Sequence, residues 1–133
     1  MNWGTVKRED APRLLLVEDD DGVRRGLQLL LEGQGFAVQS FASAGPVVAD
    51  PDSLTATHLV VDYALPDQDG VHLVEALRKR GWKGIGVLIT AYATEPLREA
   101  AQAAGFAAVI DKPFRDSQLL NALDGRRAAP GPA

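Results

Sequence analysis

The apolar run at residues 14–17 (Leu-Leu-Leu-Val) leads directly into the acidic run at residues 18–21 (Glu-Asp-Asp-Asp). Consecutive apolar residues that do not alternate with polar ones indicate a strand buried on both faces, as in a parallel sheet covered by helices. Like charges packed together cost free energy, and a fold tolerates that cost mainly where a cation offsets it. In an open α/β sheet, ligands bind at the carboxyl ends of the strands. The acidic run therefore predicts half of a divalent-metal site.

The four acids at positions 18–21 also account for the charge of the whole chain. The 133 residues include 18 Asp and Glu against 14 Lys and Arg, so the formal net charge is -4. This acidic balance argues against direct nucleic-acid binding by this chain alone. The chain has no cysteine, which excludes a disulfide framework and a thiolate metal site. No segment has the apolar length of a membrane span or the pattern of a signal peptide, so we expect a cytoplasmic protein.

Apolar runs and helical patterns alternate along the rest of the chain. Further strands are expected at residues 36–41, 59–61, 87–89 and 107–110, with helices between them and after the last. A short helix is expected near Val47 and Val48, and residues 51–53 are expected to form a turn. The longer helices are expected to face inward with Val23, Leu27, Leu30 and Leu31; Val71, Val74 and Leu77; Leu97, Ala100, Ala101 and Ala104; and Leu119, Leu120 and Leu123. Five strands alternating with five helices predict an α/β fold, in which a doubly wound parallel sheet carries helices on both faces.

Polar residues mark where the helices and the domain are expected to begin and end. The expected helix caps are Asp20 or Asp21 and Thr94, and the last helix is expected to begin at Asp116 or Ser117. A chain of 133 residues suits a single domain. We expect this domain at residues 12–127, with a flexible N-terminal tail at residues 1–11 and a Pro- and Gly-containing tail or linker start at residues 128–133.

Polar side chains close four of the five expected strands. Because parallel strands place their carboxyl ends along one edge, these side chains are expected to share a rim; they are Glu18 and Asp19, Asp62, Thr90 and Lys112. Three carboxylates and one ammonium leave two net negative charges, which one Mg²⁺ or Mn²⁺ would neutralise. A carboxylate can attack phosphorus and form an aspartyl-phosphate, and phosphoryl transfer asks a protein mainly for positioning and charge neutralisation.

Each residue of this rim has an ordinary explanation when it is taken alone. An acidic run is usually a solvated helix start, a lone Asp62 is more often a turn residue, and a lone Thr90 is more often a cap. An acid pair, an acid, a hydroxyl and an amine in that order at successive strand ends are hard to obtain by chance, so we interpret the set as a site. His58 and His72 have no partner at catalytic spacing and are interpreted as structural or solvated.

Four segments resemble the motifs of the receiver domain of two-component response regulators. Residues 14–20 resemble its first strand and acid pair, residues 62–70 its phosphoacceptor loop, and residues 90–91 and 112–114 its remaining two motifs. The resemblance covers roughly residues 12–126. It implies a flavodoxin-like fold with strand order 2-1-3-4-5, and a signalling module with slow self-catalysed phosphoryl chemistry rather than a turnover enzyme.

The resemblance also implies a role for each residue of the rim. Asp62 accepts a phosphoryl group from a histidine kinase or a phosphotransfer protein. The implied ligands of Mg²⁺ are Glu18, Asp19, Asp62 and the backbone carbonyl of Ala64. Lys112 pairs with the phosphoryl oxygens, and Thr90 moves in to hydrogen-bond them. This movement shifts the face made by the fourth helix, the fifth strand and the fifth helix, which then controls an effector protein or domain or pairs with a second copy as a homodimer.

Some positions depart from the family pattern. Val109 stands where most members carry an aromatic residue, three positions before the lysine. Tyr92 is the alternative aromatic for the switch, or else an exposed loop tyrosine. In the family, the positions of Ala64 and Tyr92 modulate hydrolysis of the aspartyl-phosphate, so its lifetime is left open.

Three other functions stay open at this point. A pseudo-receiver would act as a protein-interaction module without phosphorylation, and Val109 is the feature that favours it. A phosphohydrolase of the haloacid dehalogenase kind would carry a second aspartate two residues after Asp62, where this chain has Ala64. A flavodoxin-like flavin carrier is disfavoured by the acidic loop after the first strand, which would repel a phosphate.

Overall fold

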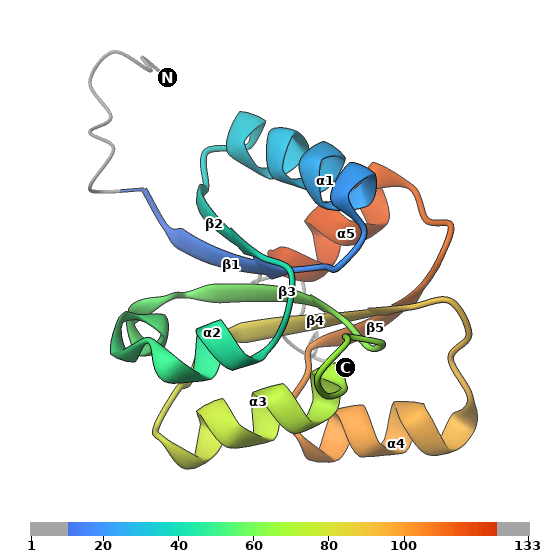
Figure 1. Ribbon diagram of the computed structural model, residues 1–133. Coiled ribbons are helices and arrows are strands. Elements are labelled where there is room, and N and C mark those ends of the chain that lie inside the picture. The colour runs from blue at the N-terminus through green and yellow to red at the C-terminus, as the bar shows by residue number, and fades with distance from the viewer. Residues whose placement is uncertain (1–10, 125–133) are drawn as a thin grey trace, which may run out of the picture.

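One parallel sheet organises the part of the chain that the structure, a computed structural model, describes, which is residues 11–124 (Figure 1). The strands are β1 (Arg13–Val17), β2 (Ala37–Phe41), β3 (His58–Asp62), β4 (Ile85–Thr90) and β5 (Ala108–Asp111). The helices are α1 (Asp21–Gly33), α2 (Gly45–Ala49), α3 (Gly70–Lys79), α4 (Glu95–Ala103) and α5 (Asp116–Leu123). The strand order is β2-β1-β3-β4-β5 and every neighbouring pair is parallel, which confirms the predicted fold class.

The strands bury apolar side chains on both faces of the sheet. In β1, Leu15 and Val17 pack on the side of α2, α3 and α4, whereas Leu14 and Leu16 pack on the side of α1 and α5. Figure 1 shows these two groups of helices as separate layers with the sheet between them. All four side chains are fully buried, and each contributes roughly 1.5–3 kcal/mol relative to an exposed position. Burial on both faces explains why this run does not alternate with polar residues.

The predicted helix stripes are mostly buried, with two exceptions. Val23 is 38% exposed because it lies in the first turn of α1, just after the loop that leaves the carboxyl edge of the sheet. Ala100 is exposed and lines an open groove instead of facing the sheet. In α4 and at its C-cap, the side chains that pack into the core are Leu97, Ala101 and Ala104, which form a narrower face than predicted.

The predicted helix starts are confirmed, but the turn predicted at residues 51–53 is wrong. Residues 51–53 belong to a 3-10 helix, Pro51–Thr55, and Asp50 caps it by accepting from the backbone N–H of Asp52. The last helix begins at Asp116, as predicted, and its N-cap is Arg115, whose backbone N–H donates to the side chain of Gln118. The caps expected for α1 and α4 are confirmed as Asp20 and Thr94.

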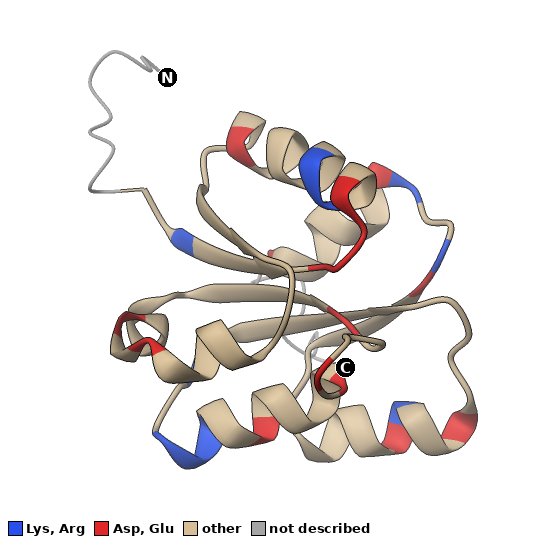
Figure 2. Cartoon of the chain, viewed as in Figure 1, with Lys and Arg blue, Asp and Glu red and all other residues tan. Residues whose placement is uncertain are grey.

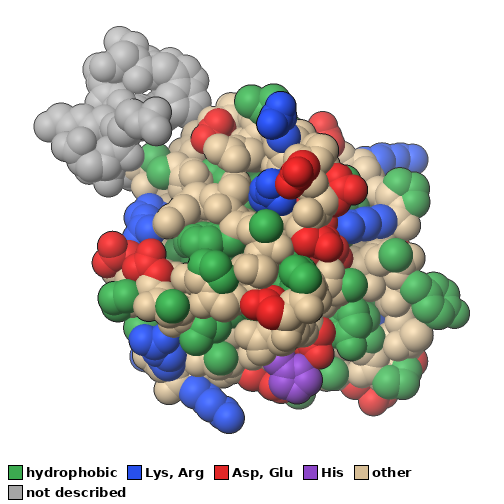
Figure 3. Space-filling view, in the orientation of Figure 1, with side chains coloured by type: hydrophobic (Ala, Val, Ile, Leu, Met, Phe, Trp, Pro, Cys, Tyr) green, Lys and Arg blue, Asp and Glu red, His purple; other side chains and the backbone are tan. Residues whose placement is uncertain are grey.

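The two edges of the sheet have different surroundings. Acidic residues follow the carboxyl ends of β1 and β3 (Figure 2), whereas over the face drawn in Figure 3 acidic and basic side chains are interspersed. Trp82 is buried before the start of β4, at the amino edge, where its indole N–H donates to the carbonyl of Ala56 at 2.7 Å.

Across residues 11–124, no helix has the length and apolar character needed to cross a membrane.

His58 joins the start of β3 to the end of α5 and is expected to make stability depend on pH. Its Nε2 lies 3.0 Å from the carbonyl oxygen of Leu123, so that nitrogen carries the proton and donates. Burial lowers the pKa of His58 below 6.5, although the bond to Leu123 opposes the shift. As the pH falls, His58 is therefore protonated in the unfolded chain before it is protonated in the folded protein. The contribution of neutral His58 to stability is full above pH 6.5 and is lost as the pH falls toward the folded-state pKa.

Denaturant unfolding of the wild type and His58→Gln at several pH values between roughly 5 and 7.5 tests this expectation. The wild type should lose more stability on acidification than the variant does. His72 is the contrasting case, because its hydrogen bond to Asp69 and the charge of Asp69 raise its pKa above 6.5. Its contribution to stability therefore has the opposite pH dependence: it is present at low pH and is lost as the pH rises. Equal pH dependence in the wild type and His58→Gln would contradict the expectation.

Candidate functional site

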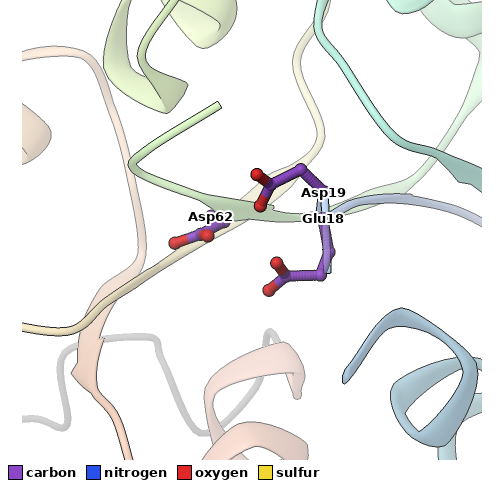
Figure 4. Close-up of side chains that lie close together, drawn as sticks. All are labelled: Glu18, Asp19 and Asp62. Carbon is purple, nitrogen blue, oxygen red and sulfur yellow. The ribbon is translucent and has the colours of Figure 1, made fainter. Parts of the chain in front are cut away.

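Three carboxylates meet at the carboxyl edge of the sheet. Glu18 and Asp19 follow β1, and Asp62 ends β3. One carboxylate oxygen from each lies within 4.8 Å of the others, and Figure 4 shows the three side chains around a common space. Glu18 is 2% exposed and Asp62 is 8% exposed, whereas Asp19 is exposed to solvent. The predicted convergence of these residues is therefore what the structure has.

The acidic run divides between the site and the start of α1. Asp20 caps the helix by accepting from the backbone N–H of Val23, and Asp21 pairs with Arg24 at 2.6 Å. The guanidinium of Arg24 also donates to the backbone carbonyl of Glu18 at 2.7 Å, which ties the helix to the end of β1. Two of the four acids thus stabilise the helix start, and the other two belong to the cluster.

Lys112 provides the positive charge inside the site. Its ammonium lies 3.2 Å from Glu18 and 3.4 Å from Asp62. Burial raises the pKa of Glu18, and the nearby charge of Asp62 adds to the rise. Burial alone would lower the pKa of Lys112, but the charge of Asp62 and the hydrogen bond and charge of Glu18 outweigh it and raise the pKa overall. The ammonium form is therefore favoured between two carboxylates that repel each other.

The donor set suits a hard divalent cation. All three side chains offer oxygen ligands, which Mg²⁺ and Mn²⁺ prefer. With the Lys112 ammonium included, ionised carboxylates leave two net negative charges, equal in magnitude to the charge of one such cation. The chemistry of the site therefore fits the cofactor expected from the sequence.

The loop between β3 and α3 is closed by its own backbone. The N–H of Tyr63 donates to the carbonyl of Ile89, and the N–H of Gly70 donates to the carbonyl of Tyr63, each at 2.8 Å. Ala64 and Asp69 form an isolated antiparallel bridge. A Cβ on Gly70 would lie 2.7 Å from the carbonyl oxygen of Asp62, so a side chain at this position would push against the end of β3. The loop holds Ala64, the expected backbone ligand, in a defined place two residues after Asp62.

Thr90 ends β4 and is buried, with its hydroxyl engaged by its own loop. The hydroxyl oxygen accepts from the N–H of Tyr92 at 3.3 Å and lies 3.4 Å from the carbonyl of that residue. The Tyr92 ring itself is 77% exposed. Val109 pairs with Leu88 and packs with the core residues on the α4 side of the sheet.

Two polar contacts near the site have no signal in the sequence. Asp111, beside Lys112, accepts from the N–H of Ala93 at 2.8 Å and pairs with Arg98 at 3.0 Å. Asp67 accepts from the backbone N–H groups of Ala44 and Gly45, which are 23 and 22 residues earlier in the chain, and these bonds lower the pKa of Asp67. Both acids are exposed and both contacts span many residues, so no local pattern marks them. His72, which is paired with Asp69 at 2.6 Å, is solvated as expected.

Comparison with known proteins identifies one family. Residues 14–124 match the family described as the response regulator receiver domain. The transcriptional regulatory protein FixJ of Azorhizobium caulinodans is 32% identical over 119 residues, covering 87% of this chain and 56% of that protein. FixJ of Rhizobium meliloti is 31% identical over 109 residues, covering 82% and 53%. The chain spans about half the length of the curated relatives it matches.

Solved structures show the same fold. The crystal structure of FixJ-N superposes with a TM-score of 0.75 at 32% identity, covering 88% of this chain and 92% of that one. A CheY-like receiver domain protein from Methanospirillum hungatei gives a TM-score of 0.78 at 25% identity, covering 89% and 94%. The non-phosphorylated HemR receiver domain from Leptospira biflexa gives 0.76 at 30% identity, covering 90% and 95%.

Removing one carboxylate from the cluster is expected to stabilise the metal-free protein. Asp62→Asn relieves the repulsion with Glu18 and should raise the free energy of unfolding by about 1 kcal/mol, as changes at functional sites often do. Mg²⁺ should then stabilise the wild type more than the variant, because binding to the folded state adds to its stability. Asp52→Asn is the matched control, an exposed acid in the 3-10 helix that precedes β3. Equal Mg²⁺ stabilisation of all three proteins in thermal melts would contradict the assignment.

Proposed function

The chain belongs to the response regulator receiver domain family, and we propose that Asp62 accepts a phosphoryl group from the histidine of a kinase or phosphotransfer protein. The observation that supports this proposal is the position of Asp62, whose carboxylate lies beside Glu18, Asp19 and Lys112. A receiver domain is a signalling domain, and the proposed chemistry is one self-catalysed transfer followed by slow hydrolysis rather than turnover of a substrate. Its proposed location is the cytoplasm.

In the proposed transfer, a carboxylate oxygen of Asp62 forms a bond to phosphorus as the bond from phosphorus to the donor imidazole nitrogen breaks. The electron pair of the broken bond stays on that nitrogen. When bound by Glu18, Asp19, Asp62 and the carbonyl of Ala64, Mg²⁺ supplies positive charge to the phosphoryl oxygens. Lys112 is already within 3.4 Å of Asp62 and would exchange its contact with the carboxylate for one with a phosphoryl oxygen.

The proposed switch begins at Thr90. A phosphoryl group adds a large local negative charge and strong acceptor oxygens. A hydroxyl donor such as Thr90 would bond to one of those oxygens only after leaving the backbone of Tyr92. The movement would shift α4, β5 and α5. We further propose that Tyr92 takes part as the switch aromatic, and that Tyr92 and Ala64 set the rate of hydrolysis.

The proposed output partner is an effector protein or an effector domain of a longer chain. The curated FixJ relatives are transcriptional regulatory proteins about twice the length of the matched region, which makes a DNA-binding output a candidate for the whole protein but not for this domain. The face formed by α4, β5 and α5 is also the proposed contact for a second copy, as a homodimer.

Phosphorylation is tested by incubating the protein with a small-molecule phosphodonor and Mg²⁺ and measuring its intact mass. We expect one phosphoryl adduct in the wild type, none in Asp62→Asn, and none when a chelator removes the metal. Asp52→Asn changes an exposed acid in the 3-10 helix before the start of β3, whereas the site lies at the end of that strand, so this variant should behave as the wild type does. The absence of an adduct in the wild type would favour the pseudo-receiver, and rapid turnover of many phosphoesters would favour a phosphohydrolase.

The switch is tested by hydrogen exchange of α4 with and without beryllofluoride, a mimic of the phosphoryl group. Exchange in α4 should change in the wild type and in Thr90→Ser, which keeps the hydroxyl, and should change less in Thr90→Ala. Tyr92→Ala separates the aromatic from the hydroxyl, because it keeps the backbone groups that contact Thr90. An undiminished response in Thr90→Ala would show that the hydroxyl does not carry the switch.

A further inference from the structure

Asp67 ties the loop between β3 and α3 to the start of α2. One of its carboxylate oxygens accepts from the backbone N–H of Ala44 at 3.0 Å, and the other accepts from the N–H of Gly45 at 2.8 Å. The residue at the N-cap of α2 is Ala44, which has no side-chain oxygen to accept from the first turn. A carboxylate 22 residues further along the chain therefore does what a local cap would do.

The chain at α2 leaves room for this contact. A Cβ built on Gly45 would lie 3.2 Å from Oδ2 of Asp67, which is closer than an ordinary van der Waals contact, so a larger residue would push the carboxylate away. Ala44 and Val47 are fully buried, and the guanidinium of Arg80 donates to the carbonyl of Val48. The start of α2 is thus a fixed point to which the loop is attached.

Asp67 lies in the outer part of the loop that carries Ala64, the proposed backbone ligand of the metal. The backbone bridge between Ala64 and Asp69 encloses residues 65–68, so the segment that carries Asp67 starts and ends at that bridge. At its base the loop is held by the bond between Gly70 and Tyr63, and at its outer part it is held by Asp67. If the outer part of the loop moved, the peptide groups on either side of Ala64 would move with it.

We propose that Asp67 is a positioning residue for metal binding, which holds the loop so that the carbonyl of Ala64 is preorganised to bind Mg²⁺. The inference rests on the proposed function, because Ala64 matters only if this edge of the sheet binds the metal. Asp67 is not one of the clustered carboxylates of the site, and its two oxygens accept from the backbone at the start of α2. Supporting residues of this kind strongly affect metal affinity because they reduce the reorganisation that binding requires.

Asp67→Asn is the direct test, because its amide keeps one acceptor oxygen and replaces the other with a donor that faces the N–H of Gly45. Calorimetric titration should show Mg²⁺ affinity about tenfold weaker than in the wild type. At saturating Mg²⁺ the rate of phosphorylation by a small phosphodonor should stay within about twofold, since only the preorganisation of the loop is lost. In the metal-free protein, the amides of Ala44 and Gly45 should exchange faster.

Two further variants make the result decisive. Asp52→Asn makes the same chemical change on an exposed acid outside the loop and should leave Mg²⁺ affinity unchanged. Gly45→Ala disturbs the contact from the α2 side by pushing the Asp67 carboxylate away, and it should weaken Mg²⁺ binding although Asp67 itself is not substituted. Faster amide exchange with unchanged Mg²⁺ affinity in Asp67→Asn would show that Asp67 is only a structural cap. That result would overturn the inference and leave the proposed function intact. A wild type that binds no Mg²⁺ would overturn the proposed function and the inference together.

Discussion

The contact of the Lys112 ammonium with Glu18 and Asp62 is the interaction on which the site depends. The two carboxylates are nearly excluded from solvent and close enough to repel each other. At such separations opposite charges attract by a few kcal/mol even with an effective dielectric constant of about 20, and this attraction offsets part of the cost of burial. The compensation is incomplete, because Asp19 adds a further negative charge. The residual negative charge is what would favour a cation at this edge of the sheet.

The parallel sheet brings these charges together. Lys112 and Glu18 are 94 residues apart in the chain, and no local structure would join them. They meet because β1 and β3 are neighbours, β5 runs in the same direction at the end of the sheet, and every crossover passes over a buried face. The apolar residues of the strands thus do two things: they form the core on both sides, and they fix where the polar residue after each strand is placed.

The sequence was sufficient for those parts of the protein that depend on apolar patterning and on chain direction. The strands, their parallel arrangement and the convergence of Glu18, Asp19 and Asp62 follow from these rules, whereas the strand order was expected only from the resemblance to a known family. Contacts between exposed polar groups that are distant in sequence do not follow, and Asp67 and Asp111 are of this kind. The burial of Val23 and Ala100 was predicted wrongly because helical spacing alone does not tell how wide a face the sheet covers. The division of the acidic run between helix and site also required the structure, because all four residues are chemically alike.

The contacts that join the neighbour of Lys112 to α4 are made by the polar side chain of Asp111 rather than by a buried ring. Val109 is small and the Tyr92 ring lies in solvent, so neither of these two positions places an aromatic side chain between Thr90 and β5. Asp111 instead holds the segment after Thr90 through the N–H of Ala93 and the side chain of Arg98. Asp111 is the neighbour of Lys112, so a phosphoryl group that drew both Thr90 and Lys112 toward Asp62 would act on both ends of this connection. In this chain, the polar contacts of Asp111 join the site to α4 at a place where a ring would otherwise be expected.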